Sequence, residues 1–342
     1  MSGIFPARRV GRQVPASRNA LIAALCCCLV VLQSCALSTN AADSRVKRIA
    51  FLRSVSTPGS VTDQAFIDEL ATHGFFEDRN LVIVGGKGDE VFPDPDSARA
   101  AVNRWQQEGI DLIVAYSTSG AEIARDNAPD AHVLFLVNDP VAAGFVRDEN
   151  RPDGNMTGVT FRIPADRMLS LVNRIMPGVK RIGLPYPPAD PAAIPSRDQF
   201  AQAARAQDLQ LLAEPFSDEP DLNRAVDALV VSAGAEVLLA SVSPTATRAL
   251  PQLAEAAGRH RVPFVANVGS AERALLTLSP DGQGIGEQLG RQAARLLNGA
   301  KAESVPVEDP RRFQLTLNES VAAELGIALP ADVVREAHVV RR

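Results

Sequence analysis

Cysteine is missing from most of this sequence. All four cysteines, Cys26, Cys27, Cys28 and Cys35, lie within the first 35 of 342 residues. A thiol is needed for a disulfide, for a zinc–thiolate site and for a cysteine nucleophile. The remainder of the chain therefore has none of these three features.

Histidines and catalytic sequence motifs are also scarce. The four histidines, His73, His132, His260 and His338, are far apart and none has the spacing of metal ligands. There is no Gly-x-Ser-x-Gly around any serine and no phosphate loop, and the glycines of the 282–286 segment lack the dinucleotide-binding spacing. We therefore expect no catalytic residue, metal or cofactor. The glycine run is interpreted as a place where the chain crosses between domains and starts a helix.

The sequence has a single long apolar run, Ala20–Leu32. Its thirteen residues fall short of the roughly 20 that a membrane-spanning helix needs. It follows four arginines and no acidic residue, and this order of a basic and an apolar segment is typical of an export signal. We predict that residues 1–34 are a signal peptide.

The apolar run ends in Leu32-Gln33-Ser34-Cys35, which resembles the lipobox of bacterial lipoproteins. We expect cleavage before Cys35 and a lipid on this cysteine, with the small polar residues 35–45 as a tether. The alternative is an ordinary secretory signal cut near residues 40–42. The expected location is the periplasm, anchored to a membrane, and Ala36 leaves the outer membrane open because it is not the Asp associated with inner-membrane retention.

The chain becomes more acidic once the leader is removed. The chain has a formal net charge of −5, and loss of the four arginines of the leader lowers it to −9. An acidic body is a poor partner for nucleic acid. About 300 remaining residues suggest two lobes, at about 100–200 residues per domain.

Short apolar runs alternate with longer helical stretches from Val46 onward, the pattern of βαβ units and parallel sheets. We therefore expect an α/β fold with two Rossmann-like lobes. The predicted strands are Arg48–Leu52, Leu81–Val84, Asp111–Ala115, Val133–Val137, Arg181–Leu184, Leu209–Ala213, Glu236–Ala240 and Pro263–Ala266. The predicted helices are Asp63–Thr72, Asp96–Glu108, Ser119–Asp126, Ser196–Ala206, Glu219–Ser232 and Thr245–Arg259.

The two halves share a local pattern. Residues 111–122 and 236–247 each contain an acid, an apolar strand and then hydroxyl residues that open a helix. Stretches rich in proline and glycine, Arg151–Gly158 and Ser279–Gly286, separate the halves. The chain is therefore expected to cross between the lobes more than once, which makes a hinge.

Polar residues follow the predicted strands in both halves, where parallel α/β sheets bind their ligands. Together they could hold carboxylate and ammonium groups, although each is also an ordinary helix N-cap type. Asp139 is the sharpest candidate, as a partner for a ligand amine or as part of an Asp139-Pro140 turn. The candidates are Ser54, Ser56, Thr57, Ser117, Thr118, Ser119, Asn138, Asp139, Tyr186, Ser241, Ser243, Thr245, Asn267 and Ser270.

Several ordered motifs between Arg48 and Pro330 carry a family resemblance. They are Glu69-Leu70 with Gly74-Phe75 and Asn80–Ile83, then Asp111–Ala115, Asn138–Val141, Gly154–Val159, Met176–Gly183 and Leu297–Ala300. With these motifs the chain resembles the ABC transporter substrate-binding family related to tryptophan/tyrosine transport binding proteins.

The resemblance implies a type I periplasmic-binding fold that closes over a small ligand, with three crossings between the lobes and no catalysis. It implies an N-terminal lobe of residues 46–157 plus 280–308 and a C-terminal lobe of residues 158–279 plus 309–342. The permease and the ATPase would be separate chains, and we expect a monomer. The ligand-facing loops would include Asp281 in addition to the strand-end residues named above.

Three loops depart from the family pattern. Thr118-Ser119-Gly120 replaces Thr-Pro-Ala, Ser243-Pro244-Thr245 replaces Asp-Asn-Thr, and Asp281-Gly282-Gln283 lacks the aromatic residues common there. The loss of an acid and of aromatic faces weakens the inference of an aromatic amino acid. An amino-acid-like ligand is still expected.

Two other functions stay open at this point. A sensory or scaffolding lipoprotein would use the same cleft to signal to a membrane receptor. A hydrolase would need a serine or Asp139 in the cleft and a base, and no histidine falls in the predicted loops.

Overall fold

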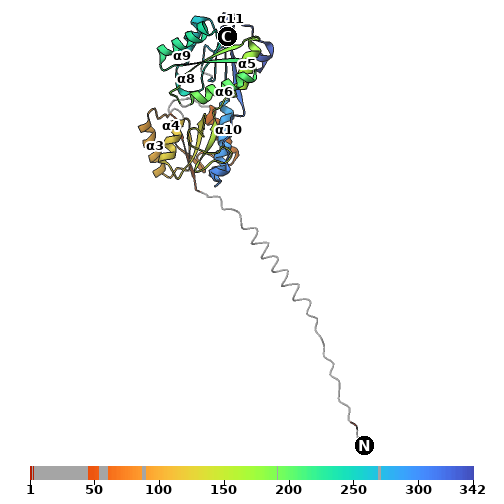
Figure 1. The fold of residues 1–342 in the computed structure, drawn as a ribbon. Coiled ribbons are helices and arrows are strands. Elements are labelled where there is room, and N and C mark those ends of the chain that lie inside the picture. Colours follow the sequence, from red (N-terminus) through yellow and green to blue (C-terminus); the bar gives the residue numbers. More distant parts are fainter. Residues whose placement is uncertain (2, 4–44, 54–60, 87–89, 191, 269–270) are drawn as a thin grey trace. The chain divides into compact units, whose positions relative to one another are not determined.

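The computed structural model describes residues 1, 3, 45–53, 61–86, 90–190, 192–268 and 271–342 (Figure 1). The predicted signal peptide, Cys35 and the candidates Ser54, Ser56, Thr57 and Ser270 lie outside these residues. The chain divides into a unit of residues 1–45 and a compact unit of residues 46–342. Only the second unit is described below.

The first sheet has five strands in the order β2-β1-β3-β4-β5, and every neighbouring pair is parallel. Its strands are β1 (Lys47–Leu52), β2 (Leu81–Gly85), β3 (Leu112–Ala115), β4 (His132–Val137) and β5 (Met156–Thr160). The helices between them are α2 (Val61–Thr72), α3 (Pro95–Gln107) and α4 (Thr118–Asn127). Two buried apolar clusters belong to this sheet, with Trp105 in one and Phe66 in the other, as expected for a sheet covered on both faces.

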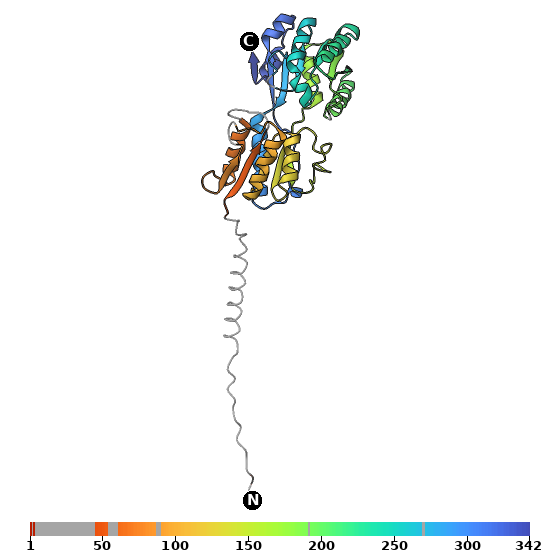
Figure 2. The same ribbon diagram turned by 90° about the vertical axis from the view of Figure 1, so that its left-hand side faces the viewer.

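The second sheet has seven strands in the order β12-β11-β10-β9-β8-β6-β7. Its strands are β6 (Arg181–Tyr186), β7 (Gln210–Pro215), β8 (Val237–Leu239), β9 (Phe264–Ala266), β10 (Leu276–Pro280), β11 (Phe313–Asn318) and β12 (Val339–Arg341). Its helices are α5 (Ala165–Ile175), α6 (Ala193–Ala206), α7 (Glu219–Asp227), α8 (Pro244–Arg248), α9 (Leu250–His260), α11 (Glu319–Leu325) and α12 (Ala331–Glu336). Figure 2 shows helices on both sides of this sheet.

The predicted fold class, an α/β protein with two lobes built on parallel sheets, is confirmed. Each predicted strand and helix is present, with three corrections. The pair β10–β11 is antiparallel. The predicted helix Thr245–Arg259 is two helices, because Pro251 in the first turn of α9 has no N–H to continue the hydrogen-bond ladder of α8. The predicted helix Glu219–Ser232 ends in a π-helical turn, η1 (Ala228–Ser232).

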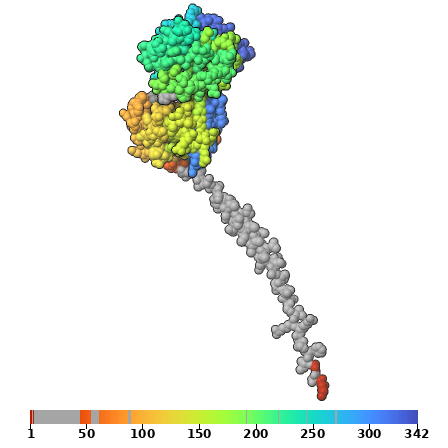
Figure 3. Space-filling view, in the orientation of Figure 1, coloured from red at the N-terminus to blue at the C-terminus, as the bar shows by residue number. Residues whose placement is uncertain are grey.

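The glycine run starts the helix α10 (Gly282–Leu297), as predicted, and α10 packs against α2. A Cβ at Gly286 would lie 2.3 Å from the carbonyl oxygen of Thr62, and one at Gly290 would lie 2.7 Å from Cβ of Glu69. Glycine is therefore required for the close approach of the two helices. In Figure 3 the blue surface of this region lies beside the yellow surface of the first lobe, although the two are far apart in sequence.

The chain passes between the two sheets after β5, between β10 and α10, and before β11. The first and last passages lie side by side, because the N–H of Thr160 donates to the carbonyl oxygen of Glu308 at 2.8 Å. The 3-10 turn η2 (Ala302–Ser304) precedes the last passage. The lobe boundaries given above stay a prediction. Among the described residues, no helix combines the length and the apolar character that crossing a membrane requires.

Candidate functional site

A buried charged cluster lies at the carboxyl end of β1. Arg53, which follows this strand, is 4% exposed. Its Nη2 donates to Oδ2 of Asp63 at 2.5 Å and to the carbonyl oxygen of Gly86 at 2.9 Å. The guanidinium lies 5.4 Å from the ring centre of Phe51 and 5.3 Å from that of Tyr116. These contacts hold Arg53 in one position beside the end of the sheet.

Tyr116 completes the cluster from the end of β3. Its hydroxyl donates a short hydrogen bond to Oδ1 of Asp63. Burial raises the pKa of Tyr116 well above its ordinary value of 10.0, the negative charge of Asp63 raises it further, and the positive charge of Arg53 partly opposes the rise. Tyr116 therefore remains a hydrogen-bond donor at physiological pH.

Helix α4 begins next to this cluster. Ser117 is its N-cap, and the Ser117 Oγ accepts a hydrogen bond from the N–H of Gly120 at 3.0 Å and lies 3.3 Å from Oγ of Ser119. The capping alternative thus holds for Ser117, whereas the side chains of Thr118 and Ser119 are exposed. A cavity of about 60 Å³ lies here, and its lining includes Arg53, Ser117 and Ser119.

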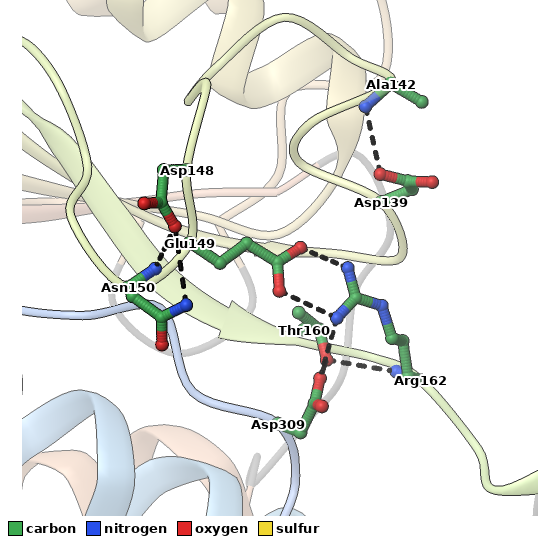
Figure 4. Close-up of polar contacts among 8 residues, drawn as sticks. All are labelled: Asp139, Ala142, Asp148, Glu149, Asn150, Thr160, Arg162 and Asp309. Carbon is green, nitrogen blue, oxygen red and sulfur yellow. Dashed lines mark hydrogen bonds and ion pairs between the residues drawn. The ribbon is translucent and has the colours of Figure 1, made fainter.

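Asp139 lies in a turn that follows β4 (Figure 4). Its Oδ1 accepts a hydrogen bond from the N–H of Ala142 at 2.9 Å, which is the turn named as the alternative reading. The pKa of Arg162 is raised by its hydrogen bond to Glu149 against the effect of burial, and the charges of Glu149, Asp309 and Asp139 contribute to the rise. Asp139 therefore acts electrostatically on the ion pairs at the crossing, and its role as a ligand partner stays a prediction.

In the second sheet, Tyr186 lies at the end of β6. Nη1 of Arg197 in α6 donates to its hydroxyl at 3.3 Å, and the guanidinium lies 5.2 Å from the ring centre. Ser241 and Asn267, which follow β8 and β9, are 1% and 3% exposed. Among the residues that the structure describes, Oγ of Ser241 and Oδ1 of Asn267 have no hydrogen-bond partner.

Ser243 and Thr245 lie at the start of α8 with an acid that the sequence analysis missed. Ser243 Oγ caps the helix by accepting from the N–H of Ala246 at 3.2 Å. Asp190 accepts from the N–H groups of Thr245 at 3.0 Å and Ala192 at 3.1 Å. Burial acts to raise the pKa of Asp190, but these two backbone hydrogen bonds and the hydroxyls of Thr245 and Ser243 hold it below its ordinary value. Asp190 is therefore an ionised carboxylate. It lies in a proline-rich loop after β6, so the rule that polar residues after strands are candidates could have identified it.

Asp281 is the N-cap of α10. Its Oδ2 accepts from the N–H of Gly284 at 3.0 Å and lies 3.1 Å from Nε of Arg312. These contacts give Asp281 a structural task at a crossing. A ligand contact for Asp281 stays a prediction.

The described candidates come together within each lobe. The hydroxyls of Ser117 and Ser119 are within hydrogen-bond distance, and Ser243 and Thr245 both contact Asp190. Among the described residues, no hydrogen bond joins the first pair to the second. Arg53 was not among the candidates predicted from the sequence. It could have been, because it is a charged residue just after an apolar strand, as Asp139 is. No group of three or more histidine, cysteine, aspartate or glutamate side chains in the described ranges could hold a metal ion.

Comparison with known proteins adds a family. Residues 48–341 match the family model described as ABC transporter substrate binding protein. The chain is also similar to the tyrosine-binding protein of Clostridioides difficile strain R20291. The two are 24% identical over 276 residues, which cover 80% of this chain and 79% of that protein.

Two solved structures are similar in fold. One is an ABC domain from Streptococcus pneumonia in complex with L-Trp, with a TM-score of 0.71, 22% identity, and coverage of 86% of this chain and 99% of that chain. The other is a ligand-free, open substrate-binding protein with adhesive properties from Clostridium difficile. It has a TM-score of 0.74, 23% identity, and the same coverage of 86% and 99%.

Proposed function

Because this chain belongs to the ABC transporter substrate binding protein family, we propose that it captures one small amino-acid-like molecule outside the cytoplasm for an ABC importer. The ligand binds between the carboxyl ends of the strands of the two lobes. It stabilises a closed state by binding that state more tightly than the open one. The permease and the ATPase are separate chains, and the protein acts as a monomer without turnover of the ligand.

The observation that carries this proposal is the cavity at the ends of β1 and β3. Its volume of about 60 Å³ is several times the roughly 10–15 Å³ that one buried water needs, so a group as small as a carboxylate can enter it. Oγ of Ser119 and the first N–H groups of α4 favour an anion there, because a helix N-terminus carries partial positive charge. The lining also contains Asp94, whose carboxylate is engaged by the N–H groups of Asp96 and Ser97 at the start of α3. Arg53 adds a buried guanidinium to the same wall.

The acids around this region suit the other charged group of an amino acid. Asp139 follows the neighbouring strand β4 and is half-buried, and we propose that its carboxylate accepts from a ligand ammonium. The relatives support an amino acid as well, since one is named for tyrosine and another holds L-Trp. We do not carry the aromatic side chains of those ligands over to this chain, because the loop Asp281-Gly282-Gln283 has no aromatic residue.

We further propose that a lipid on Cys35 holds the protein at a membrane after export. Residues 1–34 would be removed as a signal peptide, and the segment that follows would be the tether. The sequence order of arginines, apolar run and Ser34-Cys35 supports this proposal.

A thermal-shift screen of residues 36–342 tests the binding function. The probes are the twenty amino acids, with sugars, nucleosides and dicarboxylates as other classes. A ligand that binds only the folded protein raises its stability by RT ln(1 + [L]/Kd), so amino acids should raise the melting temperature and the other classes should not. Mass spectrometry of the recovered ligand checks for turnover. A shift confined to sugars or nucleosides, or conversion of the ligand, would refute the proposal.

A further inference from the structure

A row of polar side chains crosses three neighbouring strands of the second sheet. The register pairs Ile182 of β6 with Val237 of β8, and Leu239 of β8 with Val265 of β9. When this register is extended toward the carboxyl ends of the strands, Tyr186, Ser241 and Asn267 fall into one row.

The three side chains share one face of the sheet. The core cluster on this face contains Leu184, Leu239 and Val265. Side chains alternate between the two faces along a strand, so residues 186, 241 and 267, each two positions further on, lie on the same face. Helix α6 borders the row at two points. Ser196 Oγ accepts from the N–H of Val242 at 3.0 Å, and Arg197 stacks on Tyr186.

Two members of the row lack the partners that buried polar groups normally have. Ser241 and Asn267 are both more than nine-tenths buried, and within the described part of the chain Oγ of Ser241 and Oδ1 of Asn267 accept no hydrogen bond. A buried polar group without a hydrogen bond destabilises the protein, because it has lost its contact with water and gained no other partner. Two of them side by side indicate a site that a hydrogen-bond donor completes.

The charges around the row decide which donor fits. The row contains no carboxylate, and the guanidinium of Arg197 lies 5.2 Å from the ring centre of Tyr186. A buried ammonium needs a negatively charged partner. Arg197 is itself paired with Asp198 at 2.7 Å, and Asp190 on the neighbouring loop already accepts from the N–H groups of Thr245 and Ala192. A neutral donor needs no such partner.

We infer that Ser241 and Asn267 bind an amide or hydroxyl group on the side chain of the ligand. This inference rests on the proposed function and narrows its substrate class to neutral, polar amino acids. A site built to hydrogen-bond such a group rejects the apolar isostere strongly, because the isostere leaves the buried protein groups without partners.

The chain offers a matched control in Thr277. Its Oγ1 is also buried without a hydrogen-bond partner, and the residue is 1% exposed. Thr277 pairs with Ala266, which packs in the core cluster on the opposite face of the sheet. Thr277→Val therefore removes the same kind of group from the other face of the same sheet.

Calorimetric titration of residues 36–342 with three pairs of near-isosteres tests the inference: L-glutamine with L-methionine, L-asparagine with L-leucine, and L-threonine with L-valine. The wild type should bind at least one polar member at least tenfold more tightly than its apolar partner. Ser241→Ala and Asn267→Leu should each reduce that ratio at least fivefold. Thr277→Val should leave it unchanged.

The melting temperatures of the free variants separate a binding role from a structural one. Replacing an unpartnered buried polar group by an apolar group is close to neutral, so Ser241→Ala should unfold within a few degrees of the wild type. If Asn267→Leu does not fold, Ser241→Ala alone decides.

Preference of the wild type for the apolar members, or an unchanged ratio in a folded Ser241→Ala, overturns the inference and leaves the binding function standing. Failure of the wild type to bind any amino acid refutes the proposed function itself.

Discussion

The hydroxyl of Tyr116 donates a hydrogen bond to the buried carboxylate of Asp63. The same carboxylate accepts from Arg53 through its other oxygen, so β1, α2 and β3 are joined by one side chain. Arg53 of this cluster lines the cavity that we assign to a ligand carboxylate. Its stability and its pH dependence can both be measured.

Tyr116→Phe should remove an alkaline dependence of stability. The pKa of Tyr116 is raised in the folded state, so the unfolded chain loses this proton first as pH rises above about 10. The free energy of unfolding of the wild type therefore falls with rising pH above that value. Urea unfolding at pH 9 and pH 11 should show a smaller fall for Tyr116→Phe. Tyr186→Phe is the control, and an equal effect of both variants would contradict the prediction.

Asp63→Ala should strongly destabilise the protein. It leaves the guanidinium of Arg53, which is 4% exposed, without its carboxylate partner. Breaking a buried ion pair from one side costs about 3–5 kcal/mol. Asp68→Ala, at an exposed position of the same helix, should change the free energy of unfolding by less than about 0.5 kcal/mol. Equal denaturation midpoints for the two variants would rule out a role for the cluster.

Asp139→Ala should weaken binding of an amine-bearing ligand by roughly 1.5–3 kcal/mol, the range for hydrogen bonds to charged groups, with the fold intact. Asp148 is the matched control, because it too accepts from a backbone N–H in a nearby turn, that of Asn150 at 2.9 Å (Figure 4). Calorimetric titration of both variants with the amino acid found in the screen measures the difference. Unchanged affinity in Asp139→Ala would remove the assigned role.

His132 should make the protein less stable in mild acid. Burial lowers the pKa of His132 below its ordinary value of 6.5, and the charge of Asp111 only partly opposes this. The unfolded chain therefore takes up the proton first, and the free energy of unfolding falls as pH drops below about 6.5. Denaturant midpoints at pH 7.5 and pH 5.5 should differ less in His132→Asn than in the wild type. His73→Asn, at an exposed residue, should keep the difference.

Cys35→Ala should release the protein from membranes. The lipid that we predict on this cysteine would be lost together with its thiol, while the export signal before it remains. Fractionation of cells that express each form should find the wild type in the membrane pellet and the variant in the soluble fraction. Attachment of the variant to membranes would count against the lipobox.

The sequence pattern predicted the strands of the two βα repeats because a buried parallel strand is a short apolar run between amphipathic helices. It did not predict β5, β10, β11 or β12. The strands β5 and β10 overlap the passages Arg151–Gly158 and Ser279–Gly286, which are rich in proline and glycine and whose local signals are those of turns. Their pairing depends on contacts across the chain, as in the antiparallel pair of Leu276 with Leu317.

For the site, the rule that polar residues follow strands was enough to identify Ser117, Asp139 and Asn267 as candidates. It could not identify Asp63, since an acid in the first turn of a helix is ordinarily a favourable partner of the helix dipole. Its burial against Arg53 follows only from the packing of α2 on β1.

The amino-acid sequence by itself predicted the export leader, and it determined the absence of thiols from the body and the alternation of strands and helices, because these depend on neighbouring residues and on periodicity. Only the tertiary structure decided that β8 and β9 are neighbours with Leu239 opposite Val265, the register from which we infer that Ser241 and Asn267 share a row. Strand order and register are set by contacts between distant segments, and no local pattern encodes which strand becomes the neighbour of another.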